Sequence, residues 1–195
     1  MDIHAHREHP LEIWQCVAPT LSTSSDTIRP GDENDSIQFV EDDAVEGRVL
    51  QLWSPDSRRV FVACPAVALD RSLGIRLPFA ILLVRNMDKY VSLEIGVRDQ
   101  RGSVRRFRLA NYQREAHTTD ELCMLPLQLD SGWNQLRIDL PHLVQRGYGG
   151  TFAECIYVRV HASCRLKRIY FTDQLLAEEQ LPPEFKLYRK EDPSN

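Results

Sequence analysis

A chain of 195 residues with 43% hydrophobic side chains has the length and composition of one ordinary globular domain. Its apolar runs are far shorter than the roughly 20 residues of a membrane-spanning helix, and its N-terminus is too polar for a secretory signal. We therefore expect a soluble, intracellular protein. The formal charge of −4 hides a segregation, because residues 71–170 carry 16 basic against 9 acidic side chains between two acidic ends.

Residues 1–47 are predicted to hold a polar leader, one short strand and an acidic insertion. The strand lies at residues 11–16, where apolar and polar side chains alternate. Residues 17–47 are rich in Ser, Thr, Asp, Glu, Pro and Gly around one apolar island, IQFV, which is typical of a long loop or a partly ordered insertion. The main domain follows at residues 48–190, and residues 191–195 form a tail.

The first part of the main domain is predicted to consist of strands joined by tight turns. Residues 48–53 and 59–64 are expected to form a hairpin about a turn at residues 54–57. Residues 79–84, FAILLV, are apolar on both faces, which predicts a central buried strand.

The next predicted hairpin contains most of the arginines. Its first strand, residues 90–98, alternates with its apolar side chains inward and Glu94 among the outward ones. A turn at residues 99–102 leads into the return strand SVRRFRLANYQ, residues 103–113. Arginines in this number suit bidentate contact with carboxylates or phosphates.

Strand parity divides the side chains of the return strand. Phe107 and Leu109 are predicted to anchor the strand in the core, and Arg106 and Arg108 to point outward. Arg105 shares the inward parity, and we place it near the sheet margin.

The rest of the domain is predicted to contain four more strands and two short helices. The strands are residues 124–129, 133–140, 155–162 and 166–171. The helices follow residue 140, at residues 141–146, and residue 173, at residues 174–180, each with a polar cap before it. About eight short strands with hairpin spacing predict an all-β fold, an antiparallel two-sheet β-sandwich of the jelly-roll kind.

The sequence has none of the enzyme signatures that we searched for: no phosphate loop, GxGxxG, GxSxG or HExxH motif. The five cysteines are odd in number and lack a CxxC pair, so we expect reduced core thiols. His4, His6 and His9 lie in a polar segment without residues to orient a metal ligand, and His161 diverges from Cys164 by strand parity. We therefore predict no catalytic, metal or cofactor site.

Two binding alternatives remain open. The hairpin arginines, with Phe107 and Tyr112 interleaved, have the composition of a nucleic-acid groove, but the inward parity of Phe107 and the acidic net charge argue against it. A carbohydrate-binding module would stack sugars on aromatic rings, for which Trp53, Trp133 and Tyr148 are the candidates. An intracellular setting offers few glycans.

Six motifs between about residue 64 and residue 190 carry a specific family resemblance. They are LGIRLPF, RRFRLANYQ, LDSGWNQLRIDL, RGYG, VHASCRLKRIYF and LPPEFKLY. On these motifs the chain resembles the family of cilia- and flagella-associated protein twenty, also called the basal-body-upregulated family. The family's N-terminal element is reduced here to residues 9–14 behind a polar leader, so we expect a divergent paralogue.

The resemblance implies a β-sandwich of the carbohydrate-binding-module type without enzymatic activity. It implies a structural role at the inner junction of axonemal doublet microtubules, where the protein would link the B-tubule to the A-tubule and support motility. The implied partners are tubulin and other junction proteins such as the parkin co-regulated protein. The implied locations are the axoneme of the cilium or flagellum, the cytoskeleton and the basal body, with the nucleus as a second site through roles in gene expression.

The acidic surface of tubulin is the partner that the arginines suit best. We expect the docking residues to lie on the arginine-rich hairpin and near the last strand. The candidates are Arg101, Arg105, Arg106, Arg108 and Arg114 on the hairpin, and Arg165, Lys167 and Arg168 near the last strand.

Overall fold

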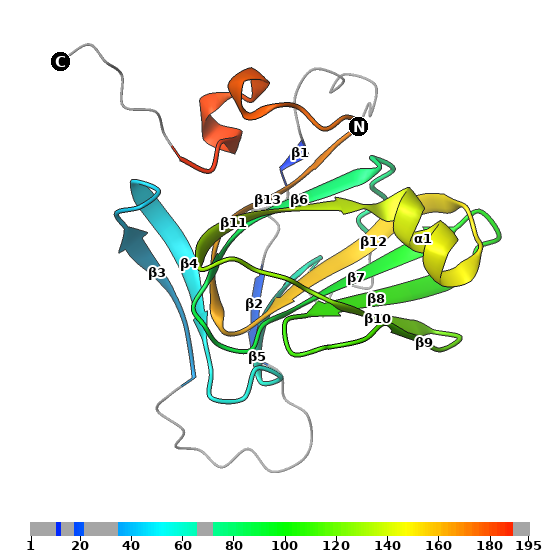
Figure 1. The fold of residues 1–195 in the computed structure, drawn as a ribbon, viewed down its shortest axis with the longest axis horizontal. Helices are drawn as coiled ribbons and strands as arrows, with labels where there is room; N and C mark the ends of the chain where they lie inside the picture. The colour runs from blue at the N-terminus through cyan, green and yellow to red at the C-terminus, as the bar shows by residue number, and fades with distance from the viewer. Residues whose placement is uncertain (1–10, 13–17, 22–34, 66–71, 189–195) are drawn as a thin grey trace.

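Two β-sheets pack face to face, and a short helix lies at one end of them (Figure 1). The computed structural model describes residues 11–12, 18–21, 35–65 and 72–188. The predicted all-β, two-sheet sandwich is confirmed.

The first sheet has six strands. They are β1 (Leu11–Glu12), β3 (Ser36–Asp42), β4 (Gly47–Trp53), β6 (Phe79–Asn86), β11 (Gly132–Asp139) and β13 (Cys164–Thr172). Their order is β11-β6-β13-β4-β3, and β1 pairs with β13 outside this path. The strand predicted to be central and buried is β6, which lies between β11 and β13.

The second sheet has seven strands. They are β2 (Ala18–Leu21), β5 (Val60–Cys64), β7 (Ser92–Asp99), β8 (Val104–Ala110), β9 (His117–Thr118), β10 (Leu122–Pro126) and β12 (Phe152–His161). Their order is β2-β5-β12-β7-β8-β10-β9. The sheet is mixed rather than purely antiparallel, because β10 runs parallel to β8.

The main core lies between the two sheets. Alternating apolar side chains of β7 and β12 face it, and Leu93, Ile95, Val97, Val158 and Val160 are each at most 2% exposed. The inward row of β7 is the one that strand parity predicted. On β12 parity also predicted Ile156, but a bulge between Cys155 and Tyr157 places Cys155 in the core instead.

The predicted hairpin of residues 48–64 is wrong, because its two strands belong to different sheets. β4 pairs with β3 and β13, whereas β5 pairs with β2 and β12. Between them, Ser54 donates its backbone N–H to the Ser163 hydroxyl at 3.1 Å, and this hydroxyl donates to the Ser54 carbonyl at 3.0 Å. Turn-forming residues bend a chain equally well within one sheet or between two sheets, so composition did not reveal the crossing.

Part of the predicted acidic insertion is a strand. Residues 36–42 form β3, which pairs with β4 along its whole length as the edge of the first sheet. Ile37 packs on the main core and Val40 on a smaller apolar cluster, so apolar contacts hold this strand. Of the strand predicted at residues 11–16, the structure describes β1, and the other residues lie outside the described part of the chain.

The helix predicted after residue 140 is present as α1 (Leu140–Tyr148). Asp139 caps it as expected, because its carboxylate accepts a hydrogen bond from the His142 N–H at 2.9 Å. The helix is longer than predicted, since Gly147 stays helical and Gly149, with a φ of 62°, ends it. No helix in the described part of the chain is long and apolar enough to span a membrane.

The second predicted helix, at residues 174–180, is not an α-helix. The chain instead forms 3-10 helices at Glu178–Gln180 and Pro183–Phe185. The Thr172 hydroxyl donates to the Gln174 carbonyl at 2.9 Å, which withdraws the first carbonyl of the predicted helix from helical pairing.

The C-terminal segment, residues 173–188, contains these two 3-10 helices and lies across the outer face of the first sheet (Figure 1). Leu181 and Phe185 are 7% and 6% exposed, and they pack against Ile81 and Tyr170. The first sheet is therefore covered on both faces, which explains why β6 is apolar on both.

Candidate docking surface

The arginines of the β7–β8 hairpin lie on the outer face of the second sheet. Phe107 is fully buried, as predicted, whereas Arg106 and Arg108 on either side of it point away from the core. In the hairpin register Arg108 lies opposite Glu94, and β12 continues the row on the other side of β7. We call the outward side chains of these three strands the arginine face; its arginines are Arg98, Arg106, Arg108 and Arg159.

Glu94 is the centre of the arginine face. Its side chain is 4% exposed, and its Oε2 accepts a hydrogen bond from Arg108 Nη2 at 2.6 Å. Its Oε1 accepts from the Tyr157 hydroxyl at 2.7 Å and lies 3.6 Å from Arg159 Nη1. Burial would raise the pKa of Glu94, but hydrogen bonds from Arg108 and Tyr157 outweigh burial and lower this pKa. The outward side of β7 is thus covered by charged and aromatic side chains.

Aromatic side chains fill the rest of the arginine face. The Tyr157 ring lies against Gly96, where an added Cβ would overlap it. The Arg159 guanidinium lies 4.8 Å from the centroid of the Phe61 ring and 5.6 Å from that of Tyr157. His161 lies 5.2 Å from Phe61 between ring centroids, and burial lowers its pKa to about 4. His161 is therefore neutral at pH 7 and adds no charge.

The exposed margin of the hairpin carries weakly paired arginines. The side chain of Arg106 is 44% exposed, and its partner Glu121, 3.1 Å away, is 80% exposed. Arg101 and Arg114 are exposed just before and just after β8. Exposed ion pairs contribute little to stability, so these guanidinium groups can exchange partners at small cost.

Arg105 lies at the sheet margin, as predicted, and contacts other parts of the chain. Its Nη1 donates to the Asp120 carbonyl at 2.7 Å, and its Nε lies 3.6 Å from the Asp99 carboxylate. Its guanidinium lies 4.6 Å from the Tyr148 ring centroid, and that ring packs edge-to-face on Phe107. Arg105 thus links β8 to the end of α1.

Arg165 pairs with a buried carboxylate on the first sheet. One carboxylate oxygen of Asp42 contacts Arg85 Nη1 at 2.6 Å and Arg165 Nη1 at 2.7 Å, and the other accepts from the Trp133 indole N–H at 3.2 Å. Burial by itself raises the pKa of Asp42, but hydrogen bonds from Arg165, Arg85 and Trp133 outweigh it and lower this pKa to about 2.

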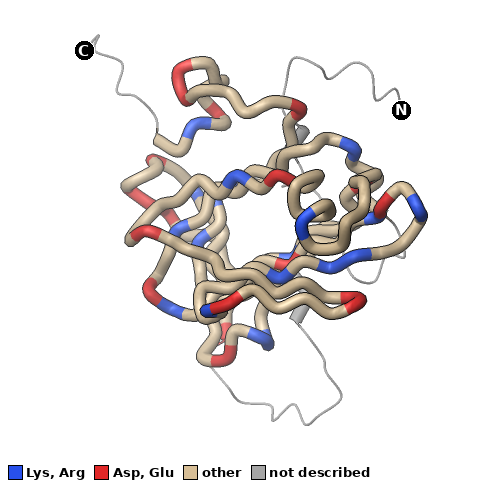
Figure 2. The backbone as a smooth tube through the Cα atoms, turned by 45° about the vertical axis from the view of Figure 1, so that its right-hand side comes forward, with Lys and Arg blue, Asp and Glu red and all other residues tan. Residues whose placement is uncertain are grey.

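Lys167 and Arg168 hold the C-terminal segment. Lys167 donates to the Leu187 carbonyl at 2.8 Å, and Arg168 donates to the Glu184 carbonyl and lies 5.1 Å from the Phe185 ring centroid. The eight predicted docking residues therefore do not form one surface. Those of the hairpin belong to the second sheet and those near the last strand to the first, and basic positions are spread over both (Figure 2).

Of the five aromatic residues that are candidates for base or sugar stacking, two are buried, Trp53 and Tyr148 are partly buried, and Tyr112 is exposed. Phe107 and Trp133 are 0% and 7% exposed, and Tyr148 packs against Phe107. Tyr112 packs against a second exposed tyrosine, Tyr90, and the centroids of the two rings lie 5.4 Å apart. Sequence reasoning named Tyr112 but missed Tyr90, although Tyr90 continues the outward positions of β7 by one step.

The described residues include no group of three or more His, Cys, Asp or Glu that could hold a metal ion. Cys155 and Cys164 are buried, and burial raises the pKa of both thiols, that of Cys164 to about 12. Thiols that stay protonated at pH 7 are poor nucleophiles. His4, His6 and His9 lie outside the described residues.

The fold and the site together define a two-sheet β-sandwich domain with a charged and aromatic outer face. The chain belongs to the CFA20 domain family, whose model matches residues 5–189. The predicted family is thereby confirmed.

Three relatives, each named Cilia- and flagella-associated protein 20, are similar to this chain over most of its length. The Chlamydomonas reinhardtii protein is 38% identical over 179 residues, which are 92% of this chain and 86% of the relative. The Caenorhabditis elegans protein is 38% identical over 156 residues, 80% of this chain and 76% of the relative. The Paramecium tetraurelia protein is 38% identical over 156 residues, 80% and 81% of the two chains. Their name associates these relatives with cilia and flagella.

Proposed function

We propose that this protein is a structural component of the cilium or flagellum. The support is its similarity to relatives whose name associates them with these organelles, in a family match that spans the whole sandwich. More specifically, we propose a non-enzymatic axonemal protein that docks on doublet microtubules as an inner-junction-type linker between the A- and B-tubules. Tubulin and the parkin co-regulated protein are the proposed partners.

The charge of the β7–β8 hairpin is the observation that carries the docking proposal. Residues 88–114 hold seven Lys or Arg and three Asp or Glu, and two of these acids, Glu94 and Asp99, are buried. The exposed charge of this segment is therefore mostly positive. Guanidinium groups would supply both attraction and orientation toward the acidic surface of tubulin.

We assign docking to the exposed arginines Arg101, Arg106 and Arg114. Arg108 also stabilises the fold, because its guanidinium donates a hydrogen bond to the buried carboxylate of Glu94. Reversing the charge of Arg108 would place two carboxylates together, and a loss of binding would then be confounded with a loss of folding.

The test is the double charge reversal Arg106→Glu with Arg114→Glu. We expect the affinity for purified doublet microtubules in co-sedimentation to fall about tenfold, which is about 1.4 kcal/mol. Incorporation into axonemes should fall with it, and the difference should shrink as salt is added. The free energy of unfolding should change by less than about 0.5 kcal/mol, because both side chains are exposed.

A matched control makes the same change in net charge elsewhere. Arg76→Glu with Arg137→Glu reverses two exposed arginines away from the β7–β8 hairpin, and we expect binding close to that of the wild type. Unchanged binding by the Arg106 and Arg114 double variant would refute the docking role of this hairpin. An equal loss in both double variants would attribute the attraction to net charge alone.

A further inference from the structure

Two exposed tyrosines meet where β7 begins and β8 ends. Tyr90 is 69% exposed and Tyr112 is 42% exposed, and their rings form an edge-to-face pair with centroids 5.4 Å apart. Tyr90 lies two residues before Ser92, the first residue of β7, and Tyr112 lies in the turn after β8, which the Gln113 N–H closes by donating to the Ala110 carbonyl at 3.2 Å. The pair therefore lies just beyond the end of the two strands that carry Glu94 and Arg108. Exposed aromatic residues of this kind are typical anchors of protein interfaces.

Hydrogen bonds to the backbone hold this tyrosine pair in place. The Asn111 side chain accepts from the Val91 N–H at 3.0 Å and donates to the Lys89 carbonyl at 2.7 Å. On the other side, the Ser163 N–H donates to the Tyr90 carbonyl at 2.7 Å. Both loops are thus positioned before a partner arrives, which reduces the entropy that binding would cost.

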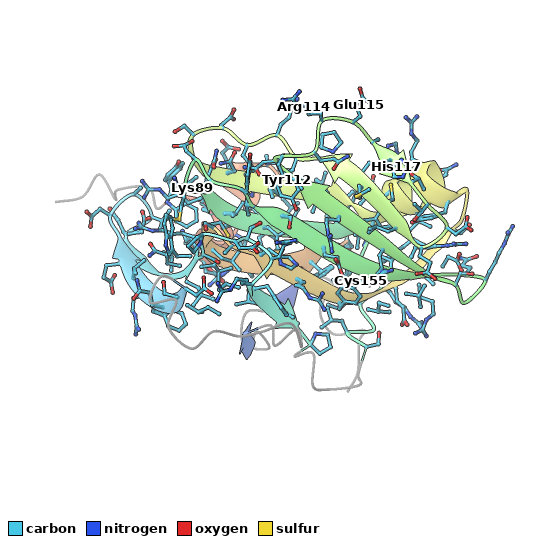
Figure 3. All side chains as sticks on the ribbon, turned by 90° about the horizontal axis from the view of Figure 1, so that it is seen from below. Lys89, Tyr112, Arg114, Glu115, His117 and Cys155 are labelled. Carbon is cyan, nitrogen blue, oxygen red and sulfur yellow. The ribbon has the colours of Figure 1, made fainter. Side chains whose placement is uncertain are left out.

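Positive charge accompanies the tyrosine pair. Lys89 and Arg114 are exposed in the loops that carry the two rings (Figure 3). Arg108 belongs to the arginine face and lies two residues before the end of β8 at Ala110. The side chain of Arg108 is still 37% exposed beside Glu94. An extended segment of a partner can therefore reach the rings and this guanidinium together.

We propose that Tyr90, Tyr112 and Arg108 form one recognition site for an extended acidic segment of a partner protein. An aromatic or proline side chain of that segment packs on the tyrosine pair, and a carboxylate further along the segment meets Arg108. The site rests on the proposed function for its axonemal location, and its recognition chemistry can be tested separately.

A protein segment fits this site better than a nucleic acid. The two rings stand at 72° to each other, so they do not present parallel faces on which successive bases could stack. Asp88 and Glu115 are exposed beside Lys89 and Arg114. A nucleic acid would bring a phosphate on every nucleotide toward these carboxylates, whereas a peptide can place an uncharged residue there.

The test compares the binding of two synthetic polymers of equal length, a random copolymer of glutamate and tyrosine, and polyglutamate. We expect the full-length protein to bind the copolymer about tenfold more tightly. The double variant Tyr90→Ala with Tyr112→Ala should lose this preference and keep its affinity for polyglutamate. The control is Tyr188→Ala, which removes a tyrosine that is 46% exposed on the C-terminal segment and should keep the preference.

Two further variants test the other parts of the site. Asn111→Ala keeps both rings but removes the hydrogen bonds that position their loops. The preference for the copolymer over polyglutamate should therefore fall below that of the wild type but not disappear. Arg108→Lys keeps a positive charge beside Glu94, and it should weaken the binding of both polymers because an ammonium replaces the guanidinium fork. Equal binding of the two polymers by the wild type would overturn the proposal, as would tighter binding of a thymidine oligonucleotide than of the copolymer.

The two proposals fail in different ways. A protein that prefers the copolymer but does not bind doublets would refute the axonemal docking and leave the tyrosine site intact. A protein that binds doublets through Arg106 and Arg114 without any preference for the copolymer would refute the tyrosine site alone.

Discussion

Asp42 shows how one buried carboxylate can join several strands. It ends β3, and its partners Arg85, Arg165 and Trp133 come from β6, β13 and β11. The hydrogen bonds more than offset the cost of burying the charge, so the carboxyl stays ionised down to a pH of about 2. The edge strand β3 is thereby attached to three other strands of the first sheet through a single side chain.

Asp42→Asn should lower the free energy of unfolding at pH 7 by about 2 kcal/mol, because two arginines lose their shared partner. Folding lowers the pKa of Asp42 to about 2, so its contribution is present above the unfolded value near 4 and is lost as the pH falls toward 2. In urea unfolding, the difference in free energy of unfolding between the wild type and Asp42→Asn should decrease as the pH falls through that range. Asp43→Asn, at the exposed neighbouring position, should change stability by less than about 0.5 kcal/mol. A gap of constant size down to about pH 2 would contradict this account.

In strand β7, residues that point away from the core are covered by side chains of neighbouring strands. Strand alternation correctly predicted that Glu94 points outward, yet Glu94 is 3% exposed. Tyr157, 63 residues further along the chain, lies against Gly96 and bonds Glu94 through its hydroxyl. Alternation along one strand determines the direction of a side chain, but residues on a neighbouring strand determine whether water reaches it.

Gly96→Ala should lower the free energy of unfolding by about 2 kcal/mol, because the new methyl group would overlap the Tyr157 ring and displace it from Glu94. Gly47→Ala in β4 is the matched control, since the nearest atom would lie 3.9 Å from its Cβ. We expect that control to stay within about 0.5 kcal/mol of the wild type in urea unfolding. If both variants proved equally stable, the Tyr157 ring would not be packed as described.

For the whole molecule, the first sheet lies between the second sheet and the C-terminal segment. Phe185 packs edge-to-face on Tyr170, with ring centroids 4.8 Å apart, and the Arg168 guanidinium lies over the Phe185 ring at 5.1 Å from its centroid. Lys167 adds hydrogen bonds to the backbone carbonyls of Lys186 and Leu187. The C-terminal segment is therefore a third layer of the fold, and the basic residues beneath it are occupied by this packing.

Phe185→Ala should lower the free energy of unfolding by about 3 kcal/mol, because it removes a buried ring from this layer. It should also increase proteolysis of the segment after β13, as that segment loses its main apolar contact. Leu175→Ala, which truncates a side chain that is 47% exposed, should change stability by less than about 0.5 kcal/mol. Similar stabilities of the two variants would show that Phe185 does not anchor the segment.

The placement of the proposed docking residues was predictable in part. Strand parity correctly separated Phe107 from Arg106 and Arg108, because side-chain direction follows from the period of a single strand. It could not separate Arg106, which is exposed, from Arg165, which bonds a buried carboxylate 123 residues away in sequence. Both are arginines in alternating segments, and only the contacts between distant strands distinguish them.

The sequence by itself determined most strands between residues 48 and 171, the inward row of β7, the cap of α1 and the family, because these depend on local periodicity and on motifs along the chain. The tertiary structure alone decided which sheet takes each strand, as the separation of β4 from β5 shows. It also decided which arginines remain exposed and brought Tyr90 against Tyr112. Sheet pairing and ion pairs with buried carboxylates join residues that are far apart in sequence. A local sequence pattern does not determine which of several similar strands or charged residues will pair.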